Sequence, residues 1–146
     1  MKLYLAYGSN MNIDQMKYRC PDAKPIGTTR LANYHLVFRR GVLTIEPKNK
    51  SFVPVAVWMI SNQDEKNLDR YEGFPRLYYK ESFVVSMKRG EYISEAMAYI
   101  MADGYPIQAP GEGYLRTCLQ GYRDFEIDCA PLMKAYEESK GGTEND

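Results

Sequence analysis

The most constraining feature of the sequence is an apolar run near its middle, "SFVPVAVWMI" at residues 51–60. A strand with one face in water alternates between apolar and polar residues, but in this run both the odd-numbered and the even-numbered positions carry apolar residues. The run therefore predicts a strand covered on both faces, between the interior of a small barrel and helices packed outside it.

Other segments predict strands and helices in irregular succession. Alternating residues predict strands at residues 2–8, 27–40, 42–47 and twice within 78–102, around a tight turn at Arg89–Gly90. Caps and helical periodicity predict helices at 12–20, 61–73 and 113–122, and a final helix around Leu132, Met133 and Tyr136. This order predicts an α+β fold, a small mixed β-barrel flanked by helices.

The chain length and charge limit the classes of function. A chain of 146 residues fits one domain, which we expect over residues 1–139, with a polar, frayed tail at 140–146. The charges of the 19 basic and 19 acidic residues cancel, and the basic residues are not clustered along the chain. We therefore expect no nucleic-acid partner. No apolar run is long enough to span a membrane, and we expect no membrane partner.

The cysteines and the single histidine limit the chemistry. Three cysteines, odd in number and far apart, argue against a disulfide framework and favour the reducing cytoplasm. With His35 as the only histidine and no CxxC motif, we expect no metal and no cofactor. The spacing does not suggest Cys–His catalysis. The sequence leaves open whether the protein is a monomer or a homodimer.

A carboxylate among aromatic residues, in "DRYEGFPRLYY", is the first candidate for catalysis. Leu68, Tyr71 and Glu72 share one face of the predicted helix, and Leu68 must be buried. Glu72 therefore points inward or to the edge of a pocket. Burial and the negative end of the helix both raise a carboxyl pKa, as a general acid/base near neutral pH requires. The alternative is a Glu that faces water or pairs with Arg70 or Arg76.

A second candidate is the turn in "YLAYGSNMN" at residues 4–12, where a strand leads into a capped helix. A glycine there allows close backbone approach to a ligand, and successive N–H groups bind anions such as a carboxylate. The spaced glycines and the lysine of a phosphate-binding P-loop are missing. The alternative is an ordinary turn in which Ser9 or Asn10 caps the helix.

Together, "YLAYGSN" and "LDRYEG…LYY" resemble the γ-glutamylcyclotransferase-like family, which includes the AIG2-like proteins. The resemblance extends from residue 3 to about residue 122 and includes "RCP" at 19–21, "LANYHLVF" at 31–38, "VAVW" at 55–58 and the Tyr114-Leu115…Gly121-Tyr122 helix. It implies a γ-glutamyl pocket built by the loop of Tyr7, Gly8, Ser9 and Asn10. It also implies that Glu72 is the acid/base and that Tyr114 lines the substrate site.

Two residues depart from the family pattern. Val55 stands where relatives often carry Gly, and Gly111 replaces a common Ser. We expect these differences to affect the far wall of the pocket. Of the aromatic residues near Glu72, we expect Tyr78 to hydrogen-bond it or the substrate. The other three aromatic residues are Tyr71, Phe74 and Tyr79. We expect at least two of these three to belong to the hydrophobic core.

The resemblance implies a small-molecule γ-glutamyl substrate. Its α-amine would attack its own γ-carbonyl, close 5-oxoproline and expel the amine partner, with Glu72 as acid/base. Two alternatives remain open. One is a related enzyme with another leaving group, such as a γ-glutamylamine or an acyl group of a biosynthetic intermediate. The other is a binding module without turnover.

Overall fold

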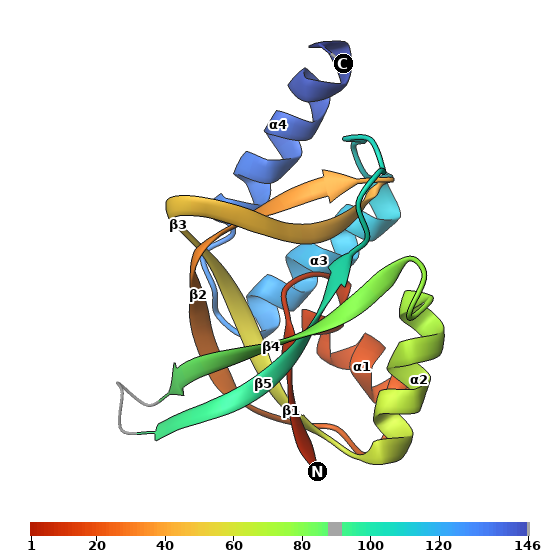
Figure 1. The fold of residues 1–146 in the computed structure, drawn as a ribbon, viewed down its shortest axis with the longest axis vertical. Helices are drawn as coiled ribbons and strands as arrows, with labels where there is room; N and C mark the ends of the chain where they lie inside the picture. The colour runs from red at the N-terminus through yellow and green to blue at the C-terminus, as the bar shows by residue number, and fades with distance from the viewer. Residues whose placement is uncertain (88–91, 146) are drawn as a thin grey trace.

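The computed structural model of the chain describes residues 1–87 and 92–145 and combines one sheet with short helices (Figure 1). The strands are β1 (Lys2–Ala6), β2 (Lys24–Arg39), β3 (Val42–Ile60), β4 (Tyr78–Met87) and β5 (Tyr92–Met101). The helices are the 3₁₀ turn η1 (Ser9–Met11), α1 (Ile13–Arg19), α2 (Asn62–Glu72), α3 (Glu112–Asp124) and α4 (Ala130–Asn145).

The sheet has the strand order β2-β3-β1-β5-β4 and is mixed, because β1 and β5 are parallel and the other pairs are antiparallel. The predicted α+β class and mixed sheet are confirmed, but the sheet is not closed into a barrel. Register shifts within β2 bend the β2–β3 hairpin. At the gap, the hydroxyl of Thr29 on β2 donates to the carbonyl of Ser86 on β4 at 2.7 Å.

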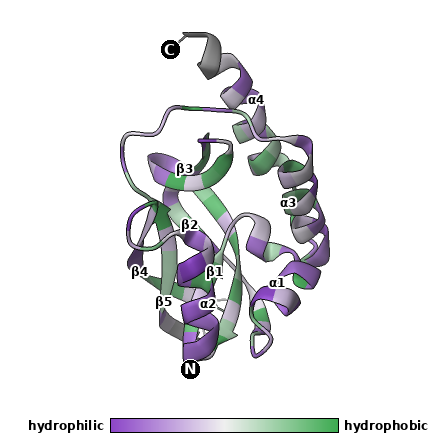
Figure 2. Cartoon of the chain, turned by 90° about the vertical axis from the view of Figure 1, so that its right-hand side faces the viewer, coloured by the Kyte–Doolittle hydropathy of each residue, from purple (hydrophilic) through white to green (hydrophobic). Residues whose placement is uncertain are grey.

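The apolar run at 51–60 lies in the second half of β3, between β2 and β1. Successive residues of this strand are buried, including Val55, Ala56, Val57 and Trp58, so both of its faces are covered as predicted. Figure 2 shows apolar residues concentrated along the sheet and hydrophilic ones on the outer surfaces of the helices. The segments 42–47 and 51–60, which the sequence suggested as separate strands, form one long strand.

The ends of α1 and α2 follow from their capping residues. The Asn12 side chain accepts a hydrogen bond from the Gln15 N–H at 3.0 Å and caps α1. Ser61 and Asp64 form a reciprocal capping box at the start of α2. Gly73, with φ 66°, ends α2 in the left-handed conformation. These caps confirm the predicted limits of the α2 helix.

The C-terminal helix extends further than the predicted elements suggested. The backbone of α4 is helical to Asn145, through the segment at 140–145 where we expected a frayed tail. The predicted Arg89–Gly90 turn lies outside the described residues. Within the described ranges, no helix has both the length and the apolar character needed to cross a membrane.

Candidate active site

A cavity of about 220 Å³ lies where the loop after β1, the end of α2, the β2–β3 turn and α3 meet. All seven predicted site residues line it: Tyr7, Gly8, Ser9, Asn10, Glu72, Tyr78 and Tyr114. The sequence did not single out a further set of lining residues, namely Tyr4, Arg40, Val42, Leu43, Leu77 and Tyr99. The structure therefore brings the two candidate motifs to one site.

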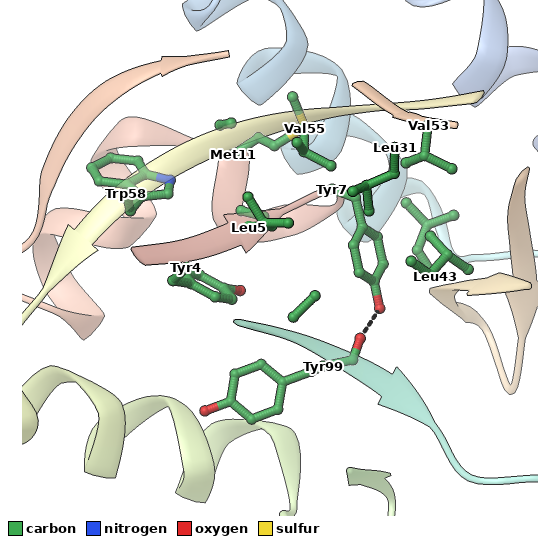
Figure 3. Packing of buried hydrophobic residues seen from close by; sticks show 14 of the residues in the cluster. Tyr4, Leu5, Tyr7, Met11, Leu31, Leu43, Val53, Val55, Trp58 and Tyr99 are labelled. Atoms are coloured by element: carbon green, nitrogen blue, oxygen red, sulfur yellow. Dashed lines mark hydrogen bonds between the residues drawn. The ribbon is translucent and has the colours of Figure 1, made fainter. Parts of the chain in front are cut away.

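The loop after β1 is held by its side chains. The Tyr7 hydroxyl donates to the carbonyl of Tyr99 on β5 at 2.5 Å (Figure 3). The Asn10 amide donates to the Tyr4 hydroxyl at 2.9 Å and accepts from Arg19 at 2.5 Å. Neither Ser9 nor Asn10 caps a helix, so the interpretation of this segment as a simple capped turn is wrong.

The same loop presents backbone donors to the cavity. Within the part of the chain that the structure describes, the N–H groups of Gly8, Ser9 and Asn10 donate to no other residue. The Gly8 carbonyl accepts from the Met11 N–H at 3.0 Å, which fixes the turn. Successive unpaired N–H groups at a cavity wall can bind a carboxylate.

The absence of a side chain at Gly8 leaves space in the cavity. A Cβ at this position would lie 3.2 Å from the Tyr114 hydroxyl and 3.3 Å from Leu43 Cδ1. A larger side chain would therefore fill the cavity between the loop, α3 and the β2–β3 hairpin.

Glu72 is the last residue of α2, and the geometry of the helix end directs it to the cavity. The Phe74 N–H donates to the Asp69 carbonyl at 2.9 Å, and the Gly73 N–H donates to the Arg70 carbonyl at 3.3 Å. These two bonds form a Schellman motif. Leu68, four residues earlier on the same face, is fully buried, as predicted.

The Glu72 carboxyl is half-buried, and within the described residues it makes no hydrogen bond or ion pair. The predicted alternative of a pair with Arg70 or Arg76 is not observed, and the Arg70 guanidinium donates instead to Asn67. Loss of water raises the pKa of Glu72 to about 7, against a smaller lowering by the charge of Arg19. The carboxyl can therefore take or give a proton near neutral pH.

Polar contacts hold α2 against the sheet and so fix the position of Glu72. The Tyr99 hydroxyl on β5 donates to Asp69 at 2.5 Å. The Lys80 ammonium on β4 lies 3.0 Å from Asp69 and 2.8 Å from Glu65. Asp69 thus ties the last turn of the helix to two strands.

The tyrosines around Glu72 are neutral hydroxyl groups. Burial is the main cause that raises the pKa values of four of them: Tyr4, Tyr7, Tyr78 and Tyr99. The Glu72 charge is the second cause for Tyr4 and Tyr78, whereas for Tyr99 the second cause is its hydrogen bond to Asp69. The Tyr78 hydroxyl donates to the Leu43 carbonyl at 2.7 Å, and the Tyr114 hydroxyl accepts from the Leu43 N–H at 3.1 Å. These tyrosine side chains form the cavity wall and exclude water from it. Glu72 is the group among them that exchanges a proton near neutral pH.

Two expectations about the surroundings of Glu72 are wrong. Tyr71, Phe74 and Tyr79 are not core, since 44%, 37% and 40% of their surfaces are exposed. Arg19 lies over the Tyr71 ring at 3.3 Å and Lys80 over the Phe74 ring at 4.3 Å. Of the three rings, only that of Tyr71 lines the cavity. The family departures, at Val55 and Gly111, do not line the cavity.

Other groups that often carry catalysis lie elsewhere. His35 lines a larger hollow of about 990 Å³ between α4 and the β2–β3 hairpin, with none of the predicted site residues. Burial raises the thiol pKa of both Cys20 and Cys118 to about 12, and neither lines the cavity that contains Glu72. Across residues 1–87 and 92–145, no three His, Cys, Asp or Glu side chains are grouped as metal ligands.

Comparison with known proteins matches most of the chain to a family. The model of the family described as "Gamma-glutamyl cyclotransferase, AIG2-like" matches residues 4–120, which include the β1 loop and Glu72. The chain belongs to the γ-glutamyl cyclotransferase, AIG2-like family. Among curated protein sequences, none matches significantly.

Solved structures show the same fold at low identity. One named gamma-glutamyl cyclotransferase has a TM-score of 0.76 and 23% identity, over 95% of this chain and 86% of that chain. An uncharacterised protein from Homo sapiens has a TM-score of 0.76 and 24% identity, over the same shares. An AIG2-like protein from Mus musculus has a TM-score of 0.59 and 16% identity, over 79% of this chain and 82% of that chain.

Proposed function

We propose that this member of the γ-glutamyl cyclotransferase, AIG2-like family is an enzyme that releases 5-oxoproline from γ-glutamyl compounds. The observation that carries the proposal is the state of Glu72, whose carboxyl has a pKa of about 7 and makes no hydrogen bond or ion pair with the described residues. It shares its cavity with the N–H groups of Gly8, Ser9 and Asn10, which donate to no other residue of the described part of the chain. A proton-transfer group and an anion-binding loop are what this ring closure needs.

In the proposed reaction, the loop N–H groups bind the α-carboxylate of the substrate and place its α-amine beside Glu72. The amine nitrogen then bonds to the γ-carbonyl carbon, and the amide bond to the leaving nitrogen breaks. Two protons leave the α-nitrogen and two reach the leaving nitrogen, so Glu72 carries them in turn and ends in its starting state. Acid–base transfer of this kind contributes about 10²- to 10⁴-fold.

Holding the substrate folded contributes a second part of the rate. The nucleophile and the carbonyl belong to one molecule, and fixing them in contact can supply about 7–11 kcal/mol of the barrier. The small, tyrosine-lined cavity would favour the folded γ-glutamyl chain over its extended forms. Exclusion of water by the phenols keeps the Glu72 pKa near 7.

The test is a screen of the purified protein for 5-oxoproline release from γ-glutamyl amino acids, γ-glutamylamines and glutathione. Release from γ-glutamyl amino acids supports the proposal. Release only from γ-glutamylamines would indicate the related enzyme with another leaving group. Saturable binding without release from any compound would indicate a binding module and contradict the proposal.

A further inference from the structure

Arg40 is a charged residue on the cavity wall to which the reaction described above assigns no role. It lies in the two-residue turn between β2 and β3, and its backbone N–H donates to the Pro106 carbonyl at 3.0 Å. Arg40 and Gly41 have φ values of 58° and 80°, as a type I′ hairpin requires. Gly, Asn and Asp are the usual residues for this turn, so the turn itself gives no reason for an arginine.

Among the described residues, the Arg40 guanidinium has no acidic partner. The neighbouring Arg39 pairs with Glu46 at 2.6 Å and donates to the Tyr105 carbonyl at 2.9 Å. In contrast, within the described ranges the Arg40 guanidinium makes no ion pair or hydrogen bond and only faces the Tyr105 ring at 5.7 Å. It is exposed and lines the cavity, which places a free cation at the cavity mouth.

The substrate supplies an anion for this cation. A γ-glutamyl amino acid has two carboxylates, one on the glutamyl part and one on the leaving amino acid. Under the proposed function, the loop at Gly8, Ser9 and Asn10 binds the first. The cavity volume of about 220 Å³ is smaller than that of a typical ligand pocket. We therefore expect the leaving group to extend to the cavity mouth, where Arg40 lies.

We propose that Arg40 is a specificity-determining residue that binds the carboxylate of the leaving amino acid. The enzyme would then act on γ-glutamyl amino acids and dipeptides in preference to γ-glutamylamines, whose leaving group has no carboxylate. This inference rests on the proposed function. An arginine fork binds a carboxylate with paired, charge-assisted hydrogen bonds, which are stronger than neutral ones.

The test compares two substrates that differ by one carboxylate, γ-glutamyl-alanine and γ-glutamyl-ethylamine. We expect the wild-type kcat/KM to favour γ-glutamyl-alanine by roughly 10- to 100-fold. In Arg40→Asn, which suits the left-handed turn, kcat/KM for γ-glutamyl-alanine should fall by about that factor, mainly through KM. The value for γ-glutamyl-ethylamine should not change. Arg30→Gln, an equal charge change at an arginine outside the cavity, is the matched control.

Two results would overturn the assignment. One is equal wild-type activity on the two substrates. The other is an equal loss on both in Arg40→Asn, which would place Arg40 on the glutamyl part. If the wild type releases 5-oxoproline from neither of these two nor from any other compound of the screen, the proposed function fails, and calorimetry with the same two compounds tests Arg40 alone. Tighter binding of γ-glutamyl-alanine that Arg40→Asn abolishes would support the assignment, and equal or absent binding would refute it.

Discussion

Glu72→Gln should make the protein more stable at pH 8. The folded-state pKa of Glu72 is about 7, against an ordinary value of 4.5, because burial disfavours the charged form. Between these pH values the folded state keeps a proton that the unfolded state has lost. The free energy of unfolding therefore falls as pH rises through this window, and above pH 7 the loss is complete.

The magnitude follows from the two pKa values. At 1.36 kcal/mol per pKa unit, the difference between 4.5 and about 7 corresponds to about 3 kcal/mol. Because the carboxyl is half-buried and water reaches the cavity mouth, we expect a gain of roughly 1–3 kcal/mol for Glu72→Gln at pH 8. Below pH 4.5 the gain should disappear, because the wild-type carboxyl is then protonated in both states.

Urea unfolding, followed by the fluorescence of the single tryptophan, Trp58, measures this difference at each pH. Comparing the two proteins at the same pH cancels the titration of all other groups. Glu81→Gln, which removes an exposed carboxylate on β4, is the control and should show no gain that depends on pH. Equal stability of the wild type and Glu72→Gln at pH 8 would refute the claim that this carboxyl is desolvated.

The remaining predictions concern the loop, its support and metals. Gly8→Val should abolish 5-oxoproline release in a folded protein, since its side chain would enter the space in front of the Tyr114 hydroxyl; Ser9→Ala should be mild, and the reverse order in kinetics would contradict a backbone anchor. Gly121→Ala should cost about 1–3 kcal/mol, because its Cβ would lie 2.7 Å from the Asn12 nitrogen. The control Gly113→Ala, with no atom within 4 Å, should gain about 0.5–1 kcal/mol in urea unfolding. EDTA should leave the rate unchanged, whereas a loss restored by one divalent ion would contradict Glu72 as the sole proton carrier.

Local patterns were enough to predict the parts of the site that lie within one element. The helical spacing of Leu68 and Glu72 placed the carboxylate on the inner face, and Ser61 and Gly73 marked the ends of its helix. The Gly8 turn was recognised because a strand runs directly into a capped helix. Each of these features depends on residues within a few positions of one another.

Contacts between distant segments were not predictable in this way. The Tyr99 hydroxyl bonds Asp69 across 30 residues, and nothing in the alternation of β5 indicates this partner. The sequence predicted strands at 27–40 and 42–47, but only the folded β2–β3 hairpin brings Arg40 to the cavity. Whether the sheet closes was also not predictable, because an apolar strand shows that both faces are covered and does not say whether the edges meet.

The most direct test of the central claim is the rate of 5-oxoproline release by Glu72→Gln relative to the wild type, on the substrate that the wild type turns over best. We expect kcat to fall by at least about 100-fold, because the amide cannot carry a proton between the two nitrogens. Calorimetric binding of 5-oxoproline should remain within a few-fold, since the loop N–H groups are unchanged. If Glu72→Gln keeps more than about a tenth of the wild-type kcat, Glu72 is not the acid/base. Such a loss would be smaller than the contribution expected of acid–base transfer.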